Sequence, residues 1–259
     1  MEIEFNNVSY KEQLKNVSFK IDTQKINSII GPTGCGKSII LQMICQLKAP
    51  DSGKVILGDS FKIGYVNQNA KEQFFCETVE KELEQSIENR NLTSEKKKKK
   101  VYDSLKMVNL ESSIINKDPL KLSHSEMRKL SLAKALIVNP NVLVLDDLTS
   151  SFDYNSKFEF IKLLKLLKRR YGKTIIIATQ DIEFAHQVSD KIIALSDGKV
   201  IAEGDKYSIY KKYDLLKLNH IPIPNIIEFE KMVYDLKKIK LGYRDEINDL
   251  VKDILRNVK

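Results

Sequence analysis

Apolar and polar positions follow two different periods along most of this chain. Alternating residues at 1–5 and 17–21 predict strands near the N-terminus. Short apolar runs, rich in isoleucine and valine, occupy residues 26–30, 63–66, 142–145, 174–178 and 191–195. Such runs predict strands that are covered on both faces, as in a parallel sheet. Residues 38–47 and 156–170 instead place apolar side chains every three or four positions, which predicts helices between the strands. This order indicates an α/β fold with a mostly parallel sheet.

Two parts of the chain break the alternation. Residues 77–138 carry a helical pattern without a convincing strand, which predicts a helical subdomain inserted into the α/β core. After a turn at Asp197 and a strand at 199–202, two further helical stretches follow at 226–238 and 244–258. We therefore expect a core in two parts, residues 1–71 and 140–204, a helical subdomain at 72–139, and a small C-terminal helical extension at 205–259.

A glycine-rich loop lies between the expected strand 26–30 and the expected helix 38–47. It consists of Gly31, Pro32, Thr33, Gly34, Cys35, Gly36, Lys37 and Ser38, which fit the P-loop pattern G-x-x-x-x-G-K-[ST]. Glycines let backbone N–H groups close around phosphate oxygens, and the start of the helix adds its positive end. Lys37 would reach the β and γ phosphates, and Ser38 would offer its hydroxyl to Mg²⁺. The loop predicts a site for ATP with Mg²⁺.

Two carboxylates end the apolar run at 142–145. Asp146 stands where an acid can bind Mg²⁺ or the water around it, and Asp147 follows directly as the candidate that polarises an attacking water. An isolated pair of this kind could be no more than a polar strand end. Behind a P-loop at this distance, it predicts catalysis of phosphoryl transfer.

Composition and charge indicate no further kind of binding site. The 259 residues carry a formal net charge of +8, but the lysines are spread along the chain, so we expect a solvated surface and no nucleic-acid partner. Cys35, Cys45 and Cys76 lack metal-ligand or C-x-x-C spacing, which predicts neither a disulfide framework nor a zinc site. The first residues lack the pattern of a signal peptide, and no stretch approaches the roughly 18 apolar residues of a membrane helix. Any membrane role is expected to depend on a partner.

The order of these motifs resembles that of the ATP-binding cassette (ABC) ATPases. Gln68 follows the strand at 63–66 at the Q-loop position, residues 122–126 (LSHSE) match the LSGGQ signature, residues 150–153 (SSFD) match the D-loop, and Gln180 occupies the position of the switch histidine. The resemblance implies that Gln68 contacts Mg²⁺ and the attacking water and that Gln180 acts on the γ-phosphate. It also implies nucleotide contacts for Tyr10, stacked on adenine, for Ile39 beside the α-phosphate, and for Ser123, Ser125 and Asp153.

A narrower resemblance covers the segment after the Q-loop. Residues 65–68 (YVNQ), 72–75 (EQFF) and 77–82 (ETVEKE) are similar to the pattern in ATPases of energy-coupling factor (ECF) transporters. This implies a composite dimer with a second ABC ATPase, either a heterodimer or, in isolation, a homodimer. It also implies an integral membrane coupling protein docked near Gln68, and a membrane protein that binds a vitamin or metal ion. The chain would then lie peripherally on the cytoplasmic face of the membrane.

The sequence departs from the family in four respects, at five positions. Asp147 replaces the usual glutamate, Gln180 the histidine, His124 and Ser125 the signature glycines, and Leu148 a proline. A shorter carboxylate would misplace the attacking water, and a carboxamide cannot carry the charge or the proton of an imidazole. Two interpretations stay open: a slow ATPase of asymmetric activity, or a non-catalytic nucleotide-binding subunit beside an active partner.

Overall fold

A six-stranded sheet forms the centre of the molecule in the computed structural model, which describes residues 3–58, 61–90, 92–238, 250–252 and 255. Its strands are β3 (Ile26–Ile30), β5 (Ile63–Val66), β6 (Val142–Asp146), β7 (Thr174–Thr179), β8 (Lys191–Ser196) and β9 (Lys199–Asp205). They lie in the order β5-β6-β7-β3-β8-β9, all parallel except for β9, which is antiparallel to β8. The expected α/β fold with a mostly parallel sheet is confirmed.

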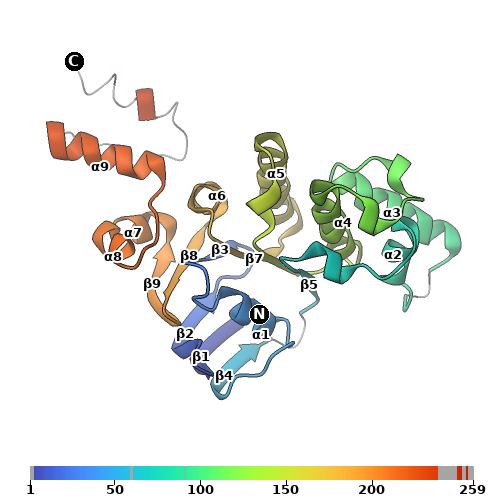
Figure 1. Cartoon of the computed structure of the whole chain (residues 1–259), viewed down its shortest axis with the longest axis horizontal. Helices are drawn as coiled ribbons and strands as arrows, with labels where there is room; N and C mark the ends of the chain where they lie inside the picture. The colour runs from blue at the N-terminus through green and yellow to red at the C-terminus, as the bar shows by residue number, and fades with distance from the viewer. Residues whose placement is uncertain (1–2, 59–60, 91, 239–249, 253–254, 256–259) are drawn as a thin grey trace.

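Helices cover both faces of this sheet. Helix α1 (Lys37–Ile44) lies on one face, and α5 (Tyr154–Tyr171) and α6 (Ile182–Val188) lie on the other (Figure 1). Successive residues of β6 point to opposite sides, so Val144 packs in the core around α1 and Leu143 in the core beneath α5. Coverage on both faces explains why the strands read as unbroken apolar runs.

A second, antiparallel sheet lies beyond α1. Its order is β2 (Leu14–Ile21), β1 (Ile3–Tyr10) and β4 (Ser52–Leu57), and the rings of Phe5 and Phe19 stack across it at 4.5 Å. Strand β1 is longer than the alternating residues 1–5 predict. Strand β4 was not predicted, because this edge strand is largely exposed and begins Ser-Gly-Lys, without a clear alternation.

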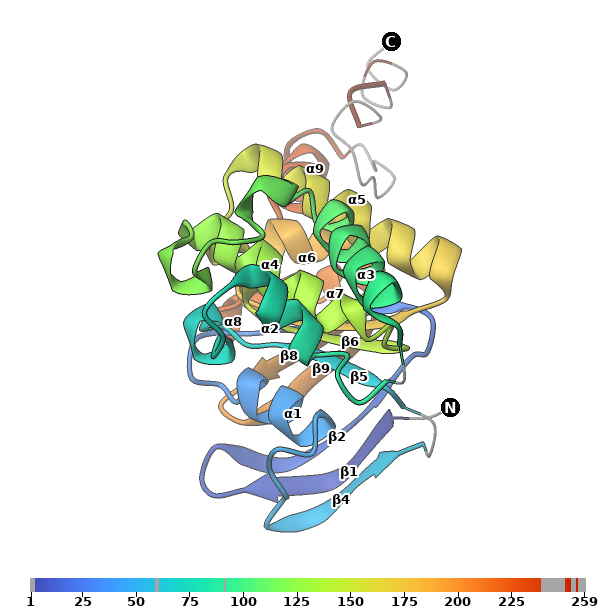
Figure 2. The ribbon, with the colours of Figure 1, turned by 90° about the vertical axis from the view of Figure 1, so that its right-hand side faces the viewer.

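Two groups of helices stand at opposite ends of the central sheet (Figure 1). Helices α2 (Val79–Gln85), α3 (Ser94–Met107) and α4 (His124–Ile137) lie beside β5, and Figure 2 shows them facing the viewer. Helices α7 (Lys206–Tyr210) and α8 (Tyr213–Leu218) lie near β9, and α9 (Asn225–Lys237) lies beyond them. Between 77 and 138, the residues that the structure describes contain helices and no strand, as the sequence predicts.

The last predicted helix, 244–258, falls mostly outside the described residues. Of the part that is described, Leu250 is buried in the core that α7 and α8 share with β8. Within the described ranges, no helix has the length and hydropathy needed to cross a bilayer.

Candidate functional site

The loop between β3 and α1 closes tightly against its neighbours, and glycine is required at two of its positions. Gly31 has φ of +154°, and a Cβ there would lie 2.1 Å from the carbonyl oxygen of Leu195 on β8. Gly36, with φ of +106°, forms the N-cap of α1, and a Cβ there would lie 2.5 Å from Leu14 Cδ2. A side chain at either position would collide with these neighbours and displace the loop. The loop therefore keeps its backbone N–H groups at the start of α1, where anions bind.

Lys37 is buried inside this loop. Its Nζ donates hydrogen bonds to the carbonyl oxygens of Gly31 at 2.7 Å and Pro32 at 2.8 Å, and its relative exposure is 8%. These two acceptors satisfy an ammonium that burial would otherwise destabilise. The positive charge of Lys37 is thus held within the loop to which the P-loop pattern assigns the β and γ phosphates.

Ser38 and Asp146 meet next to this lysine. The Ser38 hydroxyl donates to Asp146 Oδ1 at 3.1 Å, across a separation of 108 residues in the chain. Asp146 is the last residue of β6, and the carboxyl ends of the parallel strands bring it to the P-loop edge of the sheet. A hydroxyl and a carboxylate are hard oxygen donors of the kind that Mg²⁺ prefers, so these residues fit the predicted cation.

Burial shapes the electrostatics of the acidic pair. Asp146 is buried and Asp147 is partly buried. Because burial removes water from around them, the pKa of each carboxyl is raised above its ordinary value. The negative charge of Asp147 raises the pKa of Asp146 further, and that of Asp181 raises the pKa of Asp147, while Lys37 opposes the shift at both. Without a cation, the folded chain is therefore destabilised by the ionised Asp146.

Asp146→Asn is expected to stabilise the nucleotide-free chain while abolishing the Mg²⁺ dependence of its ATP binding. Because the folded-state pKa is raised, ionisation of Asp146 lowers stability as the pH rises through that value. The asparagine keeps the acceptor for Ser38 without the charge, so we expect the Tm at pH 7 to rise by about 2 °C. The gain should vanish in acid, where Asp146 is protonated.

Thermal melts of the two forms at several pH values measure this effect. Asp153→Asn is the matched control, since Asp153 is exposed and hydrogen bonds from Ser156 lower its pKa. Its Tm should not rise. A Tm for Asp146→Asn at or below that of the unmodified chain at pH 7 would contradict the prediction.

Asp147 adopts an unusual backbone conformation directly after β6. Its φ of 45° and ψ of 48° are left-handed, a region that aspartate tolerates better than most residues. Its N–H donates to the Ala178 carbonyl at 2.9 Å, and Arg128 Nη1 of α4 donates to its carbonyl at 2.8 Å. The position of Asp147 thus depends on both β7 and the helical subdomain.

The predicted site residues of the P-loop, the acidic pair and the two glutamines come together around one open hollow of about 200 Å³. It is lined by Gln13, Thr33, Gly34, Gly36, Lys37, Ser38, Ile39, Gln68, Asp146, Asp147 and Gln180. Pro32 and Cys35 line the adjoining surface of the loop. The sequence did not predict Gln13 at this site, because it lies in the turn between β1 and β2, where no residue pattern marks it. The turn lies close to the P-loop: the Gln13 carbonyl oxygen would be 3.1 Å from a Cβ placed at Gly36.

Tyr10, the predicted adenine partner, lies at the end of β1 and is not among the residues that line this hollow. The ammonium groups of Lys48 and Lys11 lie 5.1 and 5.4 Å from its ring centroid. The ring therefore already has cationic neighbours on the surface beside the P-loop.

The signature segment does not line the hollow of its own chain. Ser123 is the N-cap of α4 and forms a capping box with Glu126: the Ser123 N–H donates to Glu126 Oε2 at 2.9 Å, and the Ser123 hydroxyl lies 2.6 Å from the same oxygen. These bonds lower the pKa of Glu126. The structure thus uses this carboxylate to cap α4. Ser125 lies in the first turn of the same helix.

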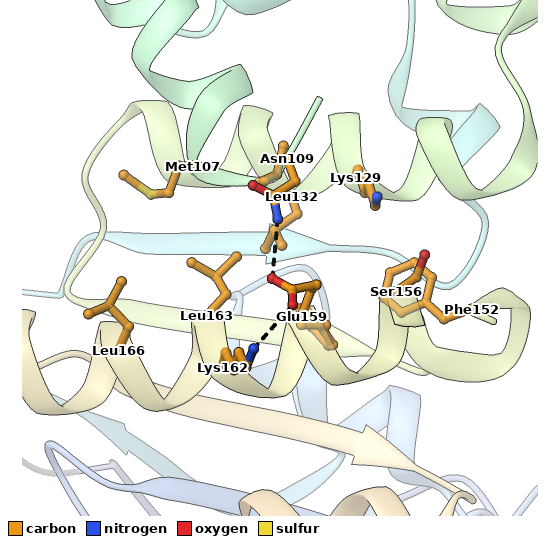
Figure 3. Close-up of a pocket in the computed structure, with 12 residues that line it drawn as sticks. Met107, Asn109, Lys129, Leu132, Phe152, Ser156, Glu159, Lys162, Leu163 and Leu166 are labelled. Atoms are coloured by element: carbon orange, nitrogen blue, oxygen red, sulfur yellow. Dashed lines mark hydrogen bonds and ion pairs between the residues drawn. The ribbon is translucent and has the colours of Figure 1, made fainter. Parts of the chain in front are cut away.

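The D-loop also lies outside the hollow, with Asp153 as the N-cap of α5, accepting a hydrogen bond from the Ser156 N–H at 2.6 Å. The ring of Phe152 packs edge-on against Phe160 at 5.4 Å. Figure 3 shows the apolar cavity of about 360 Å³ between the signature helix α4 and the D-loop helix α5, with Lys129 and Leu132 on one wall and Leu163 on the other. The two segments are therefore neighbours in the folded chain.

His186, the histidine nearest to Gln180 along the chain, has a packing role. It lies within α6 with 2% exposure, and its ring is 5.4 Å from that of Tyr210. It lies outside the lining of the hollow and does not replace Gln180 there.

Comparisons with known proteins agree with this geometry. Residues 14–150 match the ABC transporter family. The whole chain is 33% identical to the energy-coupling factor transporter ATP-binding protein EcfA3 of Oenococcus oeni and covers 96% of it. It is 28% identical to the corresponding protein EcfA2 of Staphylococcus epidermidis, with 95% of this chain and 96% of that protein aligned. The dimeric ATP-binding cassette MJ0796, solved in a post-hydrolysis state with ADP and Pi, superposes with a TM-score of 0.73 at 30% identity, over 78% of this chain and 98% of that one.

Proposed function

This chain belongs to the ABC transporter family, among its energy-coupling factor ATPases, and we propose that it couples ATP binding and slow, asymmetric hydrolysis to the uptake of a vitamin or metal ion. The observation that carries the proposal is the Ser38 hydroxyl on Asp146, directly behind a P-loop that holds Lys37. We divide the chain accordingly into a nucleotide-binding core, residues 1–71 and 140–204, a helical subdomain, 72–139, and a C-terminal extension, 205–259.

Each residue of the hollow has a defined task in this proposal. Lys37 exchanges its bonds to the loop carbonyls for bonds to phosphate oxygens, which are stronger because both partners are charged. Ser38, Asp146 and Gln68 hold Mg²⁺, which when bound neutralises charge on the β and γ phosphates. Asp147 accepts the proton of the attacking water, and Gln180 donates to the γ-phosphate.

A second ABC ATPase completes the site in this proposal. Ser123, Ser125 and Asp153 do not line the hollow of their own chain, and the related cassette MJ0796 was solved as a dimer. In such a dimer these residues face the nucleotide of the partner. The Ser123 hydroxyl is engaged by Glu126, so it must leave that carboxylate before it can donate to a phosphate. This supports a weakened site on the partner's P-loop.

One observation favours a second candidate, in which this chain binds ATP without turning it over. Asp147 has a short side chain fixed on a left-handed backbone, and Gln180 has no titratable group. Binding and turnover are separable here because Lys37 and Ser38 have the geometry for binding, whereas the residues that act on the γ-phosphate are the altered ones.

ATP hydrolysis by the purified chain mixed with its partner ATPase tests the proposal. Steady hydrolysis that requires Mg²⁺ and both chains, together with ATP-dependent uptake in vesicles that contain the membrane subunits, is the expected result. A chain that assembles with its partner but binds no nucleotide would overturn it. Nucleotide binding with all turnover in the partner would establish the second candidate.

The segment after the Q-loop is suited to a membrane partner. Phe75 is 79% exposed, and its N–H and that of Cys76 each donate to the buried carboxylate of Glu82 at 2.8 Å. Glu82 also pairs with Lys134, whose ammonium lies 5.7 Å from the Phe75 ring. The backbone around this exposed ring is thus rigid, as an anchor for another protein requires. An integral membrane coupling protein docked here would hold the chain peripherally on the cytoplasmic face of the membrane.

Phe75→Ala is expected to weaken binding to the membrane coupling protein about 10-fold, since loss of a single aromatic anchor commonly removes more than 1 kcal/mol. Affinity for ATP should not change, because Phe75 does not line the nucleotide hollow. Binding to the detergent-solubilised coupling protein provides the measurement. Leu47→Ala, which removes another exposed apolar side chain in the segment after α1, is the control. Equal binding of the coupling protein by both variants would show that its docking site lies elsewhere on the chain.

A further inference from the structure

Thr33 of the P-loop and Gln180 after β7 meet across the opening of the nucleotide hollow. The Thr33 hydroxyl donates to Gln180 Oε1 at 2.8 Å, although 147 residues separate them. Strands β3 and β7 are neighbours in the sheet, with Ile30 paired to Thr179, so the segments that follow the two strands leave the sheet side by side. The contact links the loop expected to hold the phosphates with the residue expected to sense them.

The direction of this bond determines what the carboxamide can do. A glutamine side chain accepts through Oε1 and donates through Nε2, and a phosphate oxygen can use only the donor. With Oε1 occupied by the Thr33 hydroxyl, Nε2 remains as the group directed at a further acceptor. A carboxamide without such a neighbour rotates and presents the repulsive oxygen as readily as the nitrogen.

The backbone beside Gln180 is fixed independently. The Asp181 N–H donates to Thr179 Oγ1 at 3.0 Å, and Asp181 Oδ1 accepts the N–H of Phe184 as the N-cap of α6. Asp181 also forms an ion pair with Lys157 of α5. The orientation that remains to be set is that of the Gln180 side chain itself, and Thr33 contacts its terminal group.

We propose that Thr33 is a positioning residue that orients the Gln180 carboxamide so that Nε2 donates to the γ-phosphate. The inference rests on the proposed ATP-binding function and deepens it. Gln180 then acts as a preorganised neutral sensor of the γ-phosphate in place of a mobile, titrating imidazole. Because neither side chain titrates near neutrality, the contribution of the Gln180 carboxamide to the preference for ATP over ADP should not vary between about pH 6 and 8.

A double-mutant cycle on the full chain separates this role from a direct one. Titration calorimetry with Mg·ATP and Mg·ADP should show that Thr33→Val lowers ATP affinity about 3- to 10-fold, the range for one neutral hydrogen bond, and leaves ADP affinity unchanged. In the Gln180→Ala background, Thr33→Val should have no further effect. Thr33→Ser keeps the hydroxyl and should restore the affinity, and Gln180→His should make it pH-dependent.

Three results would overturn the inference. Equal losses from Thr33→Val in both backgrounds would mean that Thr33 acts on the phosphate directly. Equal losses for ATP and ADP would mean that the substitution disturbs the loop as a whole. If the unmodified chain binds neither nucleotide while remaining folded, the proposed function fails first and the inference fails with it.

Discussion

Lys37→Ala is expected to lower the affinity of the chain for Mg·ATP by at least ~100-fold and to leave its fold intact. A charge-assisted hydrogen bond contributes about 1.5–3 kcal/mol, and Lys37 would form more than one with the β and γ phosphates. A loss of about 2.8 kcal/mol corresponds to 100-fold in affinity. The alanine leaves the Gly31 and Pro32 carbonyls without their Lys37 bonds, but the loop stays held by the close packing of Gly31 and Gly36.

Calorimetry with Mg·ATP, beside far-UV circular dichroism, measures both parts of this prediction. Lys62→Ala removes an exposed lysine that does not line the hollow and serves as the control. ATP affinity within about threefold of the unmodified chain would contradict the assignment of Lys37. Loss of the circular dichroism signal would instead show that the lysine holds the loop together, which the glycine geometry argues against.

The sequence was sufficient for the features that depend on neighbouring residues. The P-loop, the strand before it and the helix after it are encoded within 22 consecutive residues, 26–47, and β3 has the bounds that the pattern predicts. Asp146 could be placed beside Ser38 because parallel strands bring their carboxyl ends to the same edge of the sheet. Ser123 and Glu126 also fit the capping-box pattern S-x-x-E, although the same residues match the LSGGQ signature.

The remaining features arise from contacts between distant segments. No local pattern predicts that the Thr33 hydroxyl reaches Gln180 or that Arg128 reaches the Asp147 carbonyl. Gln13 is likewise brought to the hollow only by the β1–β2 turn. Strand β4 was missed because an exposed edge strand needs no strong apolar alternation. These features depend on residues far apart in the chain, so only the folded arrangement reveals them.

Asp147→Glu combined with Gln180→His is expected to raise the hydrolysis rate at this chain's own P-loop by about 10- to 100-fold. The longer carboxylate can reach a water that the aspartate leaves about an ångström out of line, and a misplacement of that size can cost 10²-fold. The imidazole adds a positive charge and a proton carrier near the γ-phosphate. The rate should then vary with pH around the histidine pKa, near 6.5, which the unmodified chain should not show.

The backbone of residue 147 limits how much of this gain is realised. Glutamate is less tolerant of the left-handed conformation than aspartate, but the Arg128 bond to its carbonyl and the N–H bond to Ala178 hold that conformation from both sides. We therefore expect Asp147→Glu alone to gain less than the pair, and Arg128→Ala to remove most of its gain. Single-turnover hydrolysis with a partner ATPase disabled at its own P-loop isolates the site. An unchanged rate in a double variant that still dimerises would show that Asp147 and Gln180 do not limit turnover at this site.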